Sequence, residues 1–444
     1  MLFQNWFLFS SLKRNLQRTC YNLNDFLKGG DISRYLKEIG AIQEAPFNQH
    51  ALDARVYRMK TMVEYACEKV PFYRELGIDQ FKKLPVVNKG IINGAFDSFI
   101  SCEYLNAELH EVYTSGSTGI PFKLYQDEHK RKWHTASVLY FMNRTNYQLG
   151  NLLFELEVIR GEEVRSDFEN FKRSAVQFDI SNLSEQSIEE LIGVIKKLKG
   201  KKNILGFSSG LEAIGDYLES NGIYLNHLNF QGIIANSEKL CDQIRKTLES
   251  HFGCPVFSRY SNEELGILAQ ETKDSGHRFE LNWSSFYYEI LDLNEDKPVK
   301  EGEIGRIVVT DLHNYAMPIL RYDTGDLGRF ETGLAGRRYL KAVEGRRLDA
   351  VYNTQGELIA SFVIITLFYP FKKAIKQYQF IQTGVRSYVI KIHPSEVFKG
   401  EEKLIALVRK EFGSDALVTI EYVDEIPTLN SGKRRKVVNV YHKE

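Results

Sequence analysis

Helical and strand periodicity alternate along the chain between residues 187 and 252, and this alternation restricts the fold more than any other feature. Ile188, Leu191 and Ile195 recur at the spacing of a helix that buries one face. Short apolar runs between such helical segments are typical of an α/β fold with a largely parallel sheet. The elements predicted after this first helix are a strand over 203–207, a helix over 210–222, a strand over 230–235 and a helix over 237–252.

The first helix of this series carries signals for both of its ends. Ser187 followed three residues later by Glu190 predicts a capping box, in which each side chain binds a free backbone N–H of the first turn. Gly200 predicts the end, because glycine readily adopts the left-handed conformation that closes a helix. We therefore expect a helix that starts close to Ser187 and stops before Gly200.

The rest of the chain has a different texture. The first hundred residues have mainly helical periodicity, and a chain of 444 residues is too long for one ordinary core. We therefore expect an N-terminal domain over 1–344, with a mainly helical part over 1–110 and an α/β and β-rich part over 111–344, and a small α+β domain over 345–444. Strands are predicted over 255–260, 265–271, 285–291, 305–312, 317–323, 378–384, 388–393 and 416–423, and a helix over 402–412.

Composition excludes several classes of partner. Lys+Arg and Asp+Glu both total 58, so the chain has no general attraction for nucleic acid. Five cysteines without a CxxC pair favour a reducing, cytoplasmic setting. The longest apolar run, over 361–371, is too short to span a membrane, and the first residues lack the features of a signal peptide. We expect neither a nucleic-acid partner nor a transmembrane segment, and the oligomeric state stays open.

A loop rich in serine, threonine and glycine lies over 114–121, between predicted strands over 111–113 and 122–127. Glycine allows close approach of the backbone, so exposed N–H groups and hydroxyls in such a loop can surround a phosphate. A plain polar hairpin turn has the same composition. The loop alone leaves both interpretations open.

Four further motifs follow the loop: RYSNEELG at 259–266, RYDTGD at 321–326, EGRRLD at 344–349 and IPTLNSGK at 426–433. Their order, spacing and content resemble the adenylate-forming enzyme superfamily. More narrowly, the chain resembles the phenylacetate-CoA ligase family and its capsular polysaccharide biosynthesis (CapK-like) branch. The resemblance extends from about Val70 to Lys433 and therefore covers most of the chain.

The resemblance implies an architecture and a reaction. The architecture is a large α/β domain with a β-rich subdomain and a small mobile α+β C-terminal domain. The reaction is attack of a carboxylate on the α-phosphate of ATP, which gives an acyl-adenylate and pyrophosphate, followed by transfer to a thiol or amine acceptor. ATP and Mg²⁺ are the implied cofactors, with coenzyme A as a further possibility.

The resemblance also implies roles for the phosphate and metal residues. The phosphates of ATP would be held by Thr114, Ser115, Gly116, Ser117, Thr118 and Gly119. Glu264 matches the glutamate that holds magnesium against these phosphates. Lys433 matches the catalytic lysine that bridges carboxylate and α-phosphate, where a cation offsets the repulsion between two anions.

The nucleoside residues follow from the same matches. Tyr260 matches the aromatic residue on the adenine, and Ser237 and Glu238 match the segment beside it. Asp326 and Arg346 match the residues that bind the ribose. Asp349 matches the acidic position at the interdomain hinge. Two positions depart from the family pattern: Ser261 replaces the frequent glycine after the tyrosine, and Leu348 occupies the more widespread acidic hinge position.

The sequence leaves the acid and the acceptor open. Trp133, His134, Tyr140 and Phe141 are candidates for the acyl site, although aromatic residues at helical spacing more often form a core. The acceptor alternatives are coenzyme A, as in an aryl or phenylacetate-type acyl-CoA ligase, and the amine of an amino acid or sugar. A noncatalytic nucleotide-binding relative is a further alternative. A kinase-like or hydrolytic enzyme is disfavoured, because the loop has no Walker lysine.

Overall fold

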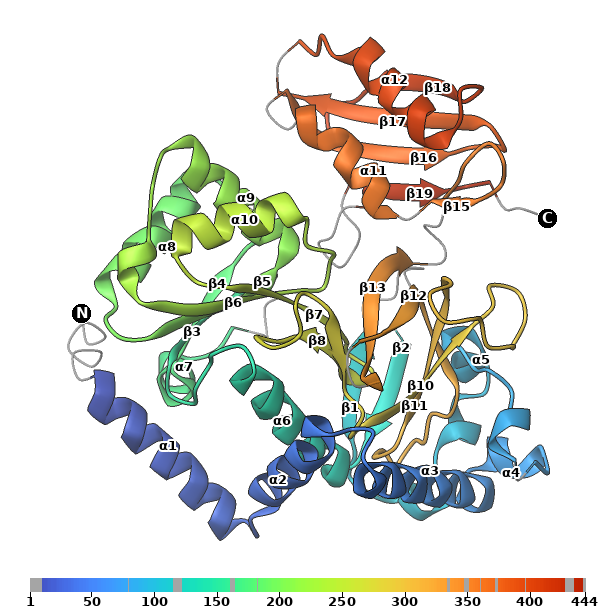
Figure 1. Ribbon diagram of the computed structural model, residues 1–444. Helices are drawn as coiled ribbons and strands as arrows, with labels where there is room; N and C mark the ends of the chain where they lie inside the picture. The colour runs from blue at the N-terminus through green and yellow to red at the C-terminus, as the bar shows by residue number, and fades with distance from the viewer. Residues whose placement is uncertain are drawn as a thin grey trace.

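The computed structural model has two parts, a large N-terminal body and a small C-terminal domain (Figure 1). The structure describes residues 10–78, 80–114, 122–159, 164–181, 183–333, 336–346, 351–359, 361–371, 374–395, 397–427 and 435–441.

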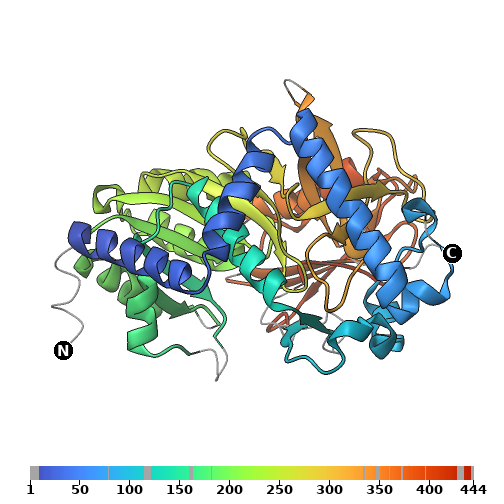
Figure 2. The ribbon, with the colours of Figure 1, turned by 90° about the horizontal axis from the view of Figure 1, so that it is seen from below.

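The N-terminal part is mainly helical, as predicted. Asn48 starts the longest of its helices by accepting a hydrogen bond from Ala51 N, and Pro71 occupies the first turn of another, where no N–H is needed. Helices α1 to α3 lie along the side of the body turned away from the C-terminal domain (Figures 1 and 2). The helices are α1 (Ser10–Leu27), α2 (Asp31–Glu44), α3 (Gln49–Lys69), α4 (Pro71–Glu75) and α5 (Lys89–Gly94), with 3-10 turns η1 (Phe81–Lys83), η2 (Phe96–Phe99) and η3 (Cys102–Tyr104).

One large sheet organises the body, in the order β10-β11-β12-β13-β9-β8-β7-β6-β5-β3-β4. Its parallel half contains β3 (Leu152–Glu157), β4 (Ala175–Asp179), β5 (Lys202–Phe207), β6 (Phe230–Asn236) and β7 (Val256–Asn262). Its antiparallel half contains β8 (Gly266–Glu271), β9 (Phe279–Leu281), β10 (Phe286–Leu291), β11 (Gly305–Asp311), β12 (Tyr322–Thr332) and β13 (Arg338–Arg346). Strand β7 pairs in parallel with β6 and antiparallel with β8, so it joins the two halves.

Helices cover both faces of the parallel half. One face packs on α8 (Glu185–Lys197), α9 (Ser208–Ser220) and α10 (Asp242–Phe252), through apolar residues such as Ile204, Ile233 and Val256. The other face packs on α6 (Glu128–Asn143) through Leu153 and Ile234, which contact Met142 and Val138. The remaining elements near this half are α7 (Asp167–Arg173) and the 3-10 turn η5 (Asn226–Leu228).

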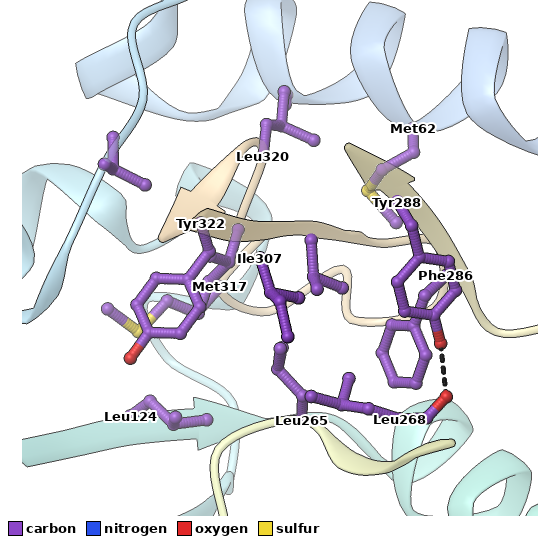
Figure 3. Packing of buried hydrophobic residues seen from close by; sticks show 14 of the residues in the cluster. Met62, Leu124, Leu265, Leu268, Phe286, Tyr288, Ile307, Met317, Leu320 and Tyr322 are labelled. Atoms are coloured by element: carbon purple, nitrogen blue, oxygen red, sulfur yellow. Dashed lines mark hydrogen bonds between the residues drawn. The ribbon is translucent and has the colours of Figure 1, made fainter. Parts of the chain in front are cut away.

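The antiparallel half packs against α3 and a separate hairpin, β1 (His110–Thr114) with β2 (Phe122–Gln126). Figure 3 shows part of this core, where Met62 of α3 lies beside Tyr288, and Leu124 of β2 lies on the other side of the cluster with Leu265 and Leu268. Tyr288 is buried there, and its hydroxyl donates to Leu268 O at 2.6 Å, which satisfies its polar end. This core fixes the turn between β7 and β8, which carries Glu264.

The C-terminal domain has its own core and a four-stranded sheet in the order β18-β17-β16-β19. Phe380, Ile390 and Leu404 are fully buried within it. Strand β13 ends at Arg346 and the next described strand begins at Val351, so the boundary between 344 and 345 stays a prediction. The elements are β14 (Val351–Tyr352), β15 (Leu358–Ile359), α11 (Ser361–Phe368), η8 (Tyr369–Phe371), β16 (Ile375–Gln382), β17 (Ser387–Pro394), α12 (Glu401–Phe412), β18 (Leu417–Tyr422) and β19 (Val437–Asn439).

Three sequence predictions about element ends were wrong. The capping box of α8 joins Ser184 to Ser187 and not Ser187 to Glu190, because the chain enters the helix three residues earlier, whereas the end of α8 at Lys197 agrees with the predicted stop before Gly200. Helix α10 begins at Asp242 and not at residue 237, since Ser237 has a φ of 66°. The segment 317–320 is not a strand, and β12 begins at Tyr322.

The helices of the described residues include none with the length and apolar character needed to cross a lipid bilayer.

Candidate active site

Tyr260 and Asp326, from two of the predicted motifs, meet at the carboxyl end of the parallel half. The buried Tyr260 hydroxyl donates to Asp326 Oδ2 at 2.8 Å and lies 3.2 Å from Thr324 Oγ1. Burial, and next the carboxylate of Asp326, raise the pKa of Tyr260 well above its usual value, so the phenol keeps its proton. Thr324 in turn donates to Ile307 O at 3.0 Å. The structure thus brings together two residues 66 positions apart in sequence.

Glu264 lies on the turn between β7 and β8 and is 4% exposed. Its Oε1 atom accepts a hydrogen bond from Tyr322 Oη and forms an ion pair with Lys89 Nζ, both at 2.9 Å. Burial first, and then Glu264, raise the pKa of Tyr322. A buried carboxylate requires such partners, because an unpaired charge in the interior is costly. Glu264 is therefore the central acceptor of a small polar cluster.

Lys89 is a site residue that the sequence did not reveal. It is the first residue of α5, and besides Glu264 it donates to Thr114 Oγ1 at 3.3 Å and lies 5.3 Å from the Phe122 ring centroid. A lysine at the start of a short helix carries no distinguishing pattern. Only its contacts identify it, since they join the end of β1 to Glu264.

Thr114 is buried at the end of β1, where it pairs with Phe122 of β2. The hairpin therefore presents both ends of the loop beside Lys89 and Glu264. The other predicted phosphate-binding residues, Ser115, Gly116, Ser117, Thr118 and Gly119, lie outside the described residues. Lys123 on β2 forms an ion pair with Glu111 at 2.6 Å.

Ser237 and Glu238 follow the end of β6 and are held against the start of α9. Ser209 N donates to Glu238 Oε2 at 2.9 Å, and Ser208 Oγ donates to Glu238 O at 2.8 Å. The left-handed conformation of Ser237 turns the chain away from the strand. Neither Ser237 nor Glu238 caps α10, because the N-cap of that helix is Cys241.

An ion pair connects this turn with β13. Lys239 Nζ lies 3.4 Å from Glu344 Oε2. Burial lowers the pKa of Lys239, although Glu344 opposes the change. Arg346 is directly opposite Asp326 in the β12–β13 register, and its side chain is outside the described part of the structure. The turn at 237–239, Asp326 and Arg346 therefore belong to one connected region.

Asp349 and Lys433 lie outside the described residues. Three residues after Lys433, Lys436 Nζ forms an ion pair with Glu212 Oε2 of α9 at 3.1 Å, and so connects the two domains. Burial disfavours the charged lysine, but Glu212, Tyr378 and Glu238 together outweigh burial, so the pKa of Lys436 is raised.

The acyl-site candidates on α6 divide into two groups. Trp133, Tyr140 and Phe141 are buried in the core, as aromatic residues at helical spacing usually are. His134 is partly exposed and lies against Gly266, where an added Cβ would be 2.6 Å from its Cδ2 atom. His134 is therefore the one partly exposed residue among these four candidates.

Comparison with known proteins agrees with this architecture. The family model of the CapK C-terminal domain matches residues 351–440. Protein CapK of Staphylococcus aureus is 22% identical over 93% of this chain and 94% of its own length. The phenylacetate-coenzyme A ligase of Thermus thermophilus is 24% identical over 68% of this chain and 73% of its own.

A solved structure gives the same result for the fold. The 2-hydroxyisobutyryl-CoA ligase in the postadenylation state, in complex with R3-HIB-AMP, has a TM-score of 0.69 at 18% identity and covers 88% of this chain and 90% of its own. The chain is thus a relative of CapK and of the phenylacetate-coenzyme A ligases, with the architecture of an adenylate-forming ligase.

Proposed function

We propose that this protein is an AMP-forming ligase, which activates a carboxylic acid with ATP to an acyl-adenylate and then transfers the acyl group to a thiol or amine. The observation that carries the proposal is the hydrogen bond between Tyr260 and Asp326. It unites the motifs at 259–266 and 321–326 within an adenylate-forming fold, and Glu264 lies on the adjoining turn.

The nucleoside is assigned to the region around Tyr260. The Tyr260 ring would contact the adenine, and Asp326 would accept hydrogen bonds from the ribose hydroxyls together with Arg346. The hydroxyl of Tyr260 orients Asp326 through Oδ2. Ser237 and Glu238 would border the adenine, and their hydrogen bonds to the start of α9 hold that turn in place before ATP binds.

The phosphates are assigned to the region of Thr114, the loop Ser115–Gly119 and Lys89. Magnesium, when bound, neutralises phosphate charge, and Glu264 is the residue that would hold it. The chemistry of the cluster fits, since one carboxylate lies beside a hydroxyl and a cation. No group of three or more metal-binding side chains occurs in the part of the chain that is described, so the phosphates would supply most other ligands. Lys89 would have to release Glu264 Oε1.

Lys433 is the proposed catalytic lysine, and the hinge is proposed at Asp349. A lysine on a small domain can enter the site for adenylation and leave it for acyl transfer. The Lys436–Glu212 ion pair supports this arrangement, because it holds the segment that follows Lys433 against α9, whose first residues bind Glu238. The proposal thus assigns the domain contact to the adenylation step.

The proposal includes two alternatives for the molecule that accepts the acyl group. Coenzyme A is favoured by the relatives named phenylacetate-coenzyme A ligase. An amine of an amino acid or sugar is the alternative acceptor. A place in capsular or surface polysaccharide synthesis would fit the similarity to protein CapK along 93% of the chain. A noncatalytic nucleotide-binding protein is the third alternative.

ATP–pyrophosphate exchange tests the proposal. The assay would use magnesium and a panel of aryl acids, fatty acids, amino acids, uronic acids and dicarboxylic acids. Exchange that depends on one class of acid, with AMP as the nucleotide product after acyl transfer, supports a ligase. Release of ADP would support the hydrolytic alternative, and ATP binding without exchange for any acid would support the noncatalytic one.

The Lys433→Ala variant tests the role of that lysine. Exchange is expected to fall by about 100-fold or more, as when a group that stabilises transition-state charge is removed, with little change in ATP affinity. Lys410→Ala, at an exposed position of α12 in the same domain, is the matched control and should keep full exchange. Equal losses of ATP binding and exchange in Lys433→Ala would contradict the assignment.

A further inference from the structure

Arg259 is a buried arginine for which no carboxylate partner is present among the described residues. It precedes Tyr260 on β7 and is 8% exposed. Its Nε atom donates to Gln270 Oε1 at 2.6 Å, and its Nη2 atom is buried without a hydrogen-bond partner in the described structure. A guanidinium has five N–H donors, and the two on Nη2 are available to bind an anion. Leaving a buried cation in this condition is costly unless another molecule completes it.

The side chain of Arg259 lies on the face of the sheet that α6 covers. Gln270, which accepts its hydrogen bond, donates in turn to Phe141 O of α6 at 2.7 Å. Ala235 of β6 pairs with Ser258 of β7. The next residue of β6, Asn236, therefore lies level with the next residue of β7, Arg259. Its Oδ1 atom is also buried without a partner in the described structure. The carboxyl ends of β6 and β7 are where an open parallel sheet usually binds its ligand.

His134 of α6 borders the same region. It is partly exposed, and Gly266 leaves room for its ring, since a Cβ there would be 2.8 Å from Nε2. The charged groups that act on His134 are Lys130, Arg131 and Arg259, and all are cations. Lys130 is neutralised by Asp311 at 2.6 Å, whereas Arg259 has no such counterpart among the described residues. The local field therefore favours an anion.

We propose that the carboxylic acid activated by this protein carries a second anionic group, and that Arg259 binds this group with the His134 ring beside it. The inference rests on the proposed function, because the acid's first carboxylate must react with ATP. It identifies the substrate class as dicarboxylic acids or acids with an equivalent second anion. Arg259 is then a specificity-determining residue, and it need not contact the reacting atoms.

Pyrophosphate exchange with matched substrates tests the proposal. Each dicarboxylic acid in the panel is compared with its monoamide, which has nearly the same size but no second charge. The wild-type protein should prefer the diacid by about 10- to 100-fold in kcat/KM, the range expected for charge-assisted hydrogen bonds. Arg259→Met should remove most of this preference, and Arg259→Lys should retain part of it.

Arg278→Met is the matched control. Arg278 is a partly buried arginine, and its guanidinium lies 4.3 Å from the Tyr339 ring centroid. Tyr339 is near the start of β13, and Arg346 is at the other end of that strand. Its replacement should leave the diacid preference unchanged. ATP affinity and the unfolding temperature of each variant show whether it is folded, and Arg259→Lys retains the charge if Arg259→Met is not.

The outcomes separate the two proposals. Equal exchange with diacid and monoamide, or a preference that survives in Arg259→Met, overturns the inference while the ligase function stands. Exchange with no acid at all, despite ATP binding, overturns the ligase function and the inference with it. Loss of the diacid preference in Arg259→Met alone, with normal ATP affinity, supports both.

Discussion

Each face of the sheet at β7 has one buried arginine, and the two arginines differ in their partners. On the face covered by α10, Arg245 contacts Glu271 through Nη1–Oε2 at 2.8 Å and Nη2–Oε1 at 2.9 Å, and it also donates to Val256 O. On the face covered by α6, Arg259 has only Gln270 as a described hydrogen-bond partner. Both side chains are 7–8% exposed. Each arginine has one buried nitrogen without a partner in the described structure, Nε of Arg245 and Nη2 of Arg259. The difference is the charge: Glu271 balances Arg245 within the fold, and the substrate, in our proposal, balances Arg259.

In our proposal, buried arginines have two roles in this protein: one stabilises the fold and the other binds a ligand. A bidentate arginine–carboxylate pair fixes α10 against β7 and β8, and removing one partner leaves the other buried without compensation. An arginine that lacks a carboxylate lowers the stability of the empty fold but is ready for an anionic ligand. Regions that bind ligands commonly carry such local costs.

The largest expected effect is on the paired face. Glu271→Ala leaves Arg245 buried without its carboxylate, so the free energy of unfolding should fall by about 3 kcal/mol or more. Urea denaturation measures this loss. The diacid preference should not change, because Glu271 faces α10; a stability loss below about 1 kcal/mol would show that the pair contributes as little as a surface ion pair.

Arg259→Met should change the stability of the protein little and its preference for diacids strongly. Removing a buried charge without a carboxylate partner should change the free energy of unfolding by less than about 1 kcal/mol, or increase it. Denaturation measured alongside Glu271→Ala makes the contrast direct. A loss as large as that of Glu271→Ala would mean that Arg259 is part of the structural framework, and the difference between the two faces would disappear.

Asp326→Ala tests the residue that Tyr260, the next residue along β7, holds in place. It should weaken ATP binding by about 10-fold, because the ribose loses charge-assisted hydrogen bonds. Isothermal titration of ATP into the variant measures the change. Tyr260→Phe, which keeps the ring but not the hydroxyl, should cause a smaller loss, and unchanged ATP affinity in Asp326→Ala would remove the ribose assignment.

The smallest effect concerns the pH dependence of stability. Burial, followed by Lys130, Arg131 and Arg259, lowers the pKa of His134 to about 3. The unfolded chain therefore binds a proton below about pH 6.5 that the folded protein does not, so stability falls as the pH falls from 6.5 toward 3. His134→Gln should reduce this acid sensitivity by about 1 kcal/mol near pH 5.5. Identical acid profiles for variant and wild type would show that the ring is freely hydrated.

Strands β5, β6 and β7 of the parallel half could be predicted from the sequence, because they are short apolar segments between helices or strands in the interior, whereas β3 and β4 were not predicted. Strands β5 and β6 and helix α9 were expected within two residues of their observed bounds. In the antiparallel half, β9 and β13 were not predicted, and most of β12 lay outside the predicted strand. These strands are defined by pairing with distant segments, such as Leu340 with Phe279, and local periodicity does not record such pairing.

The motifs of the sequence determined which residue types the site contains, since a hydroxyl-rich loop, an acidic turn and a ribose-type aspartate are each local patterns. Only the tertiary structure decided which of these side chains contact one another. It placed Lys89 on Glu264, Tyr260 on Asp326 and Lys436 on Glu212, and it left Arg259 without a described carboxylate. The physical reason is that the cost of a buried charge depends on what lies within a few ångströms in space, and the sequence spacing of the residues does not set that distance.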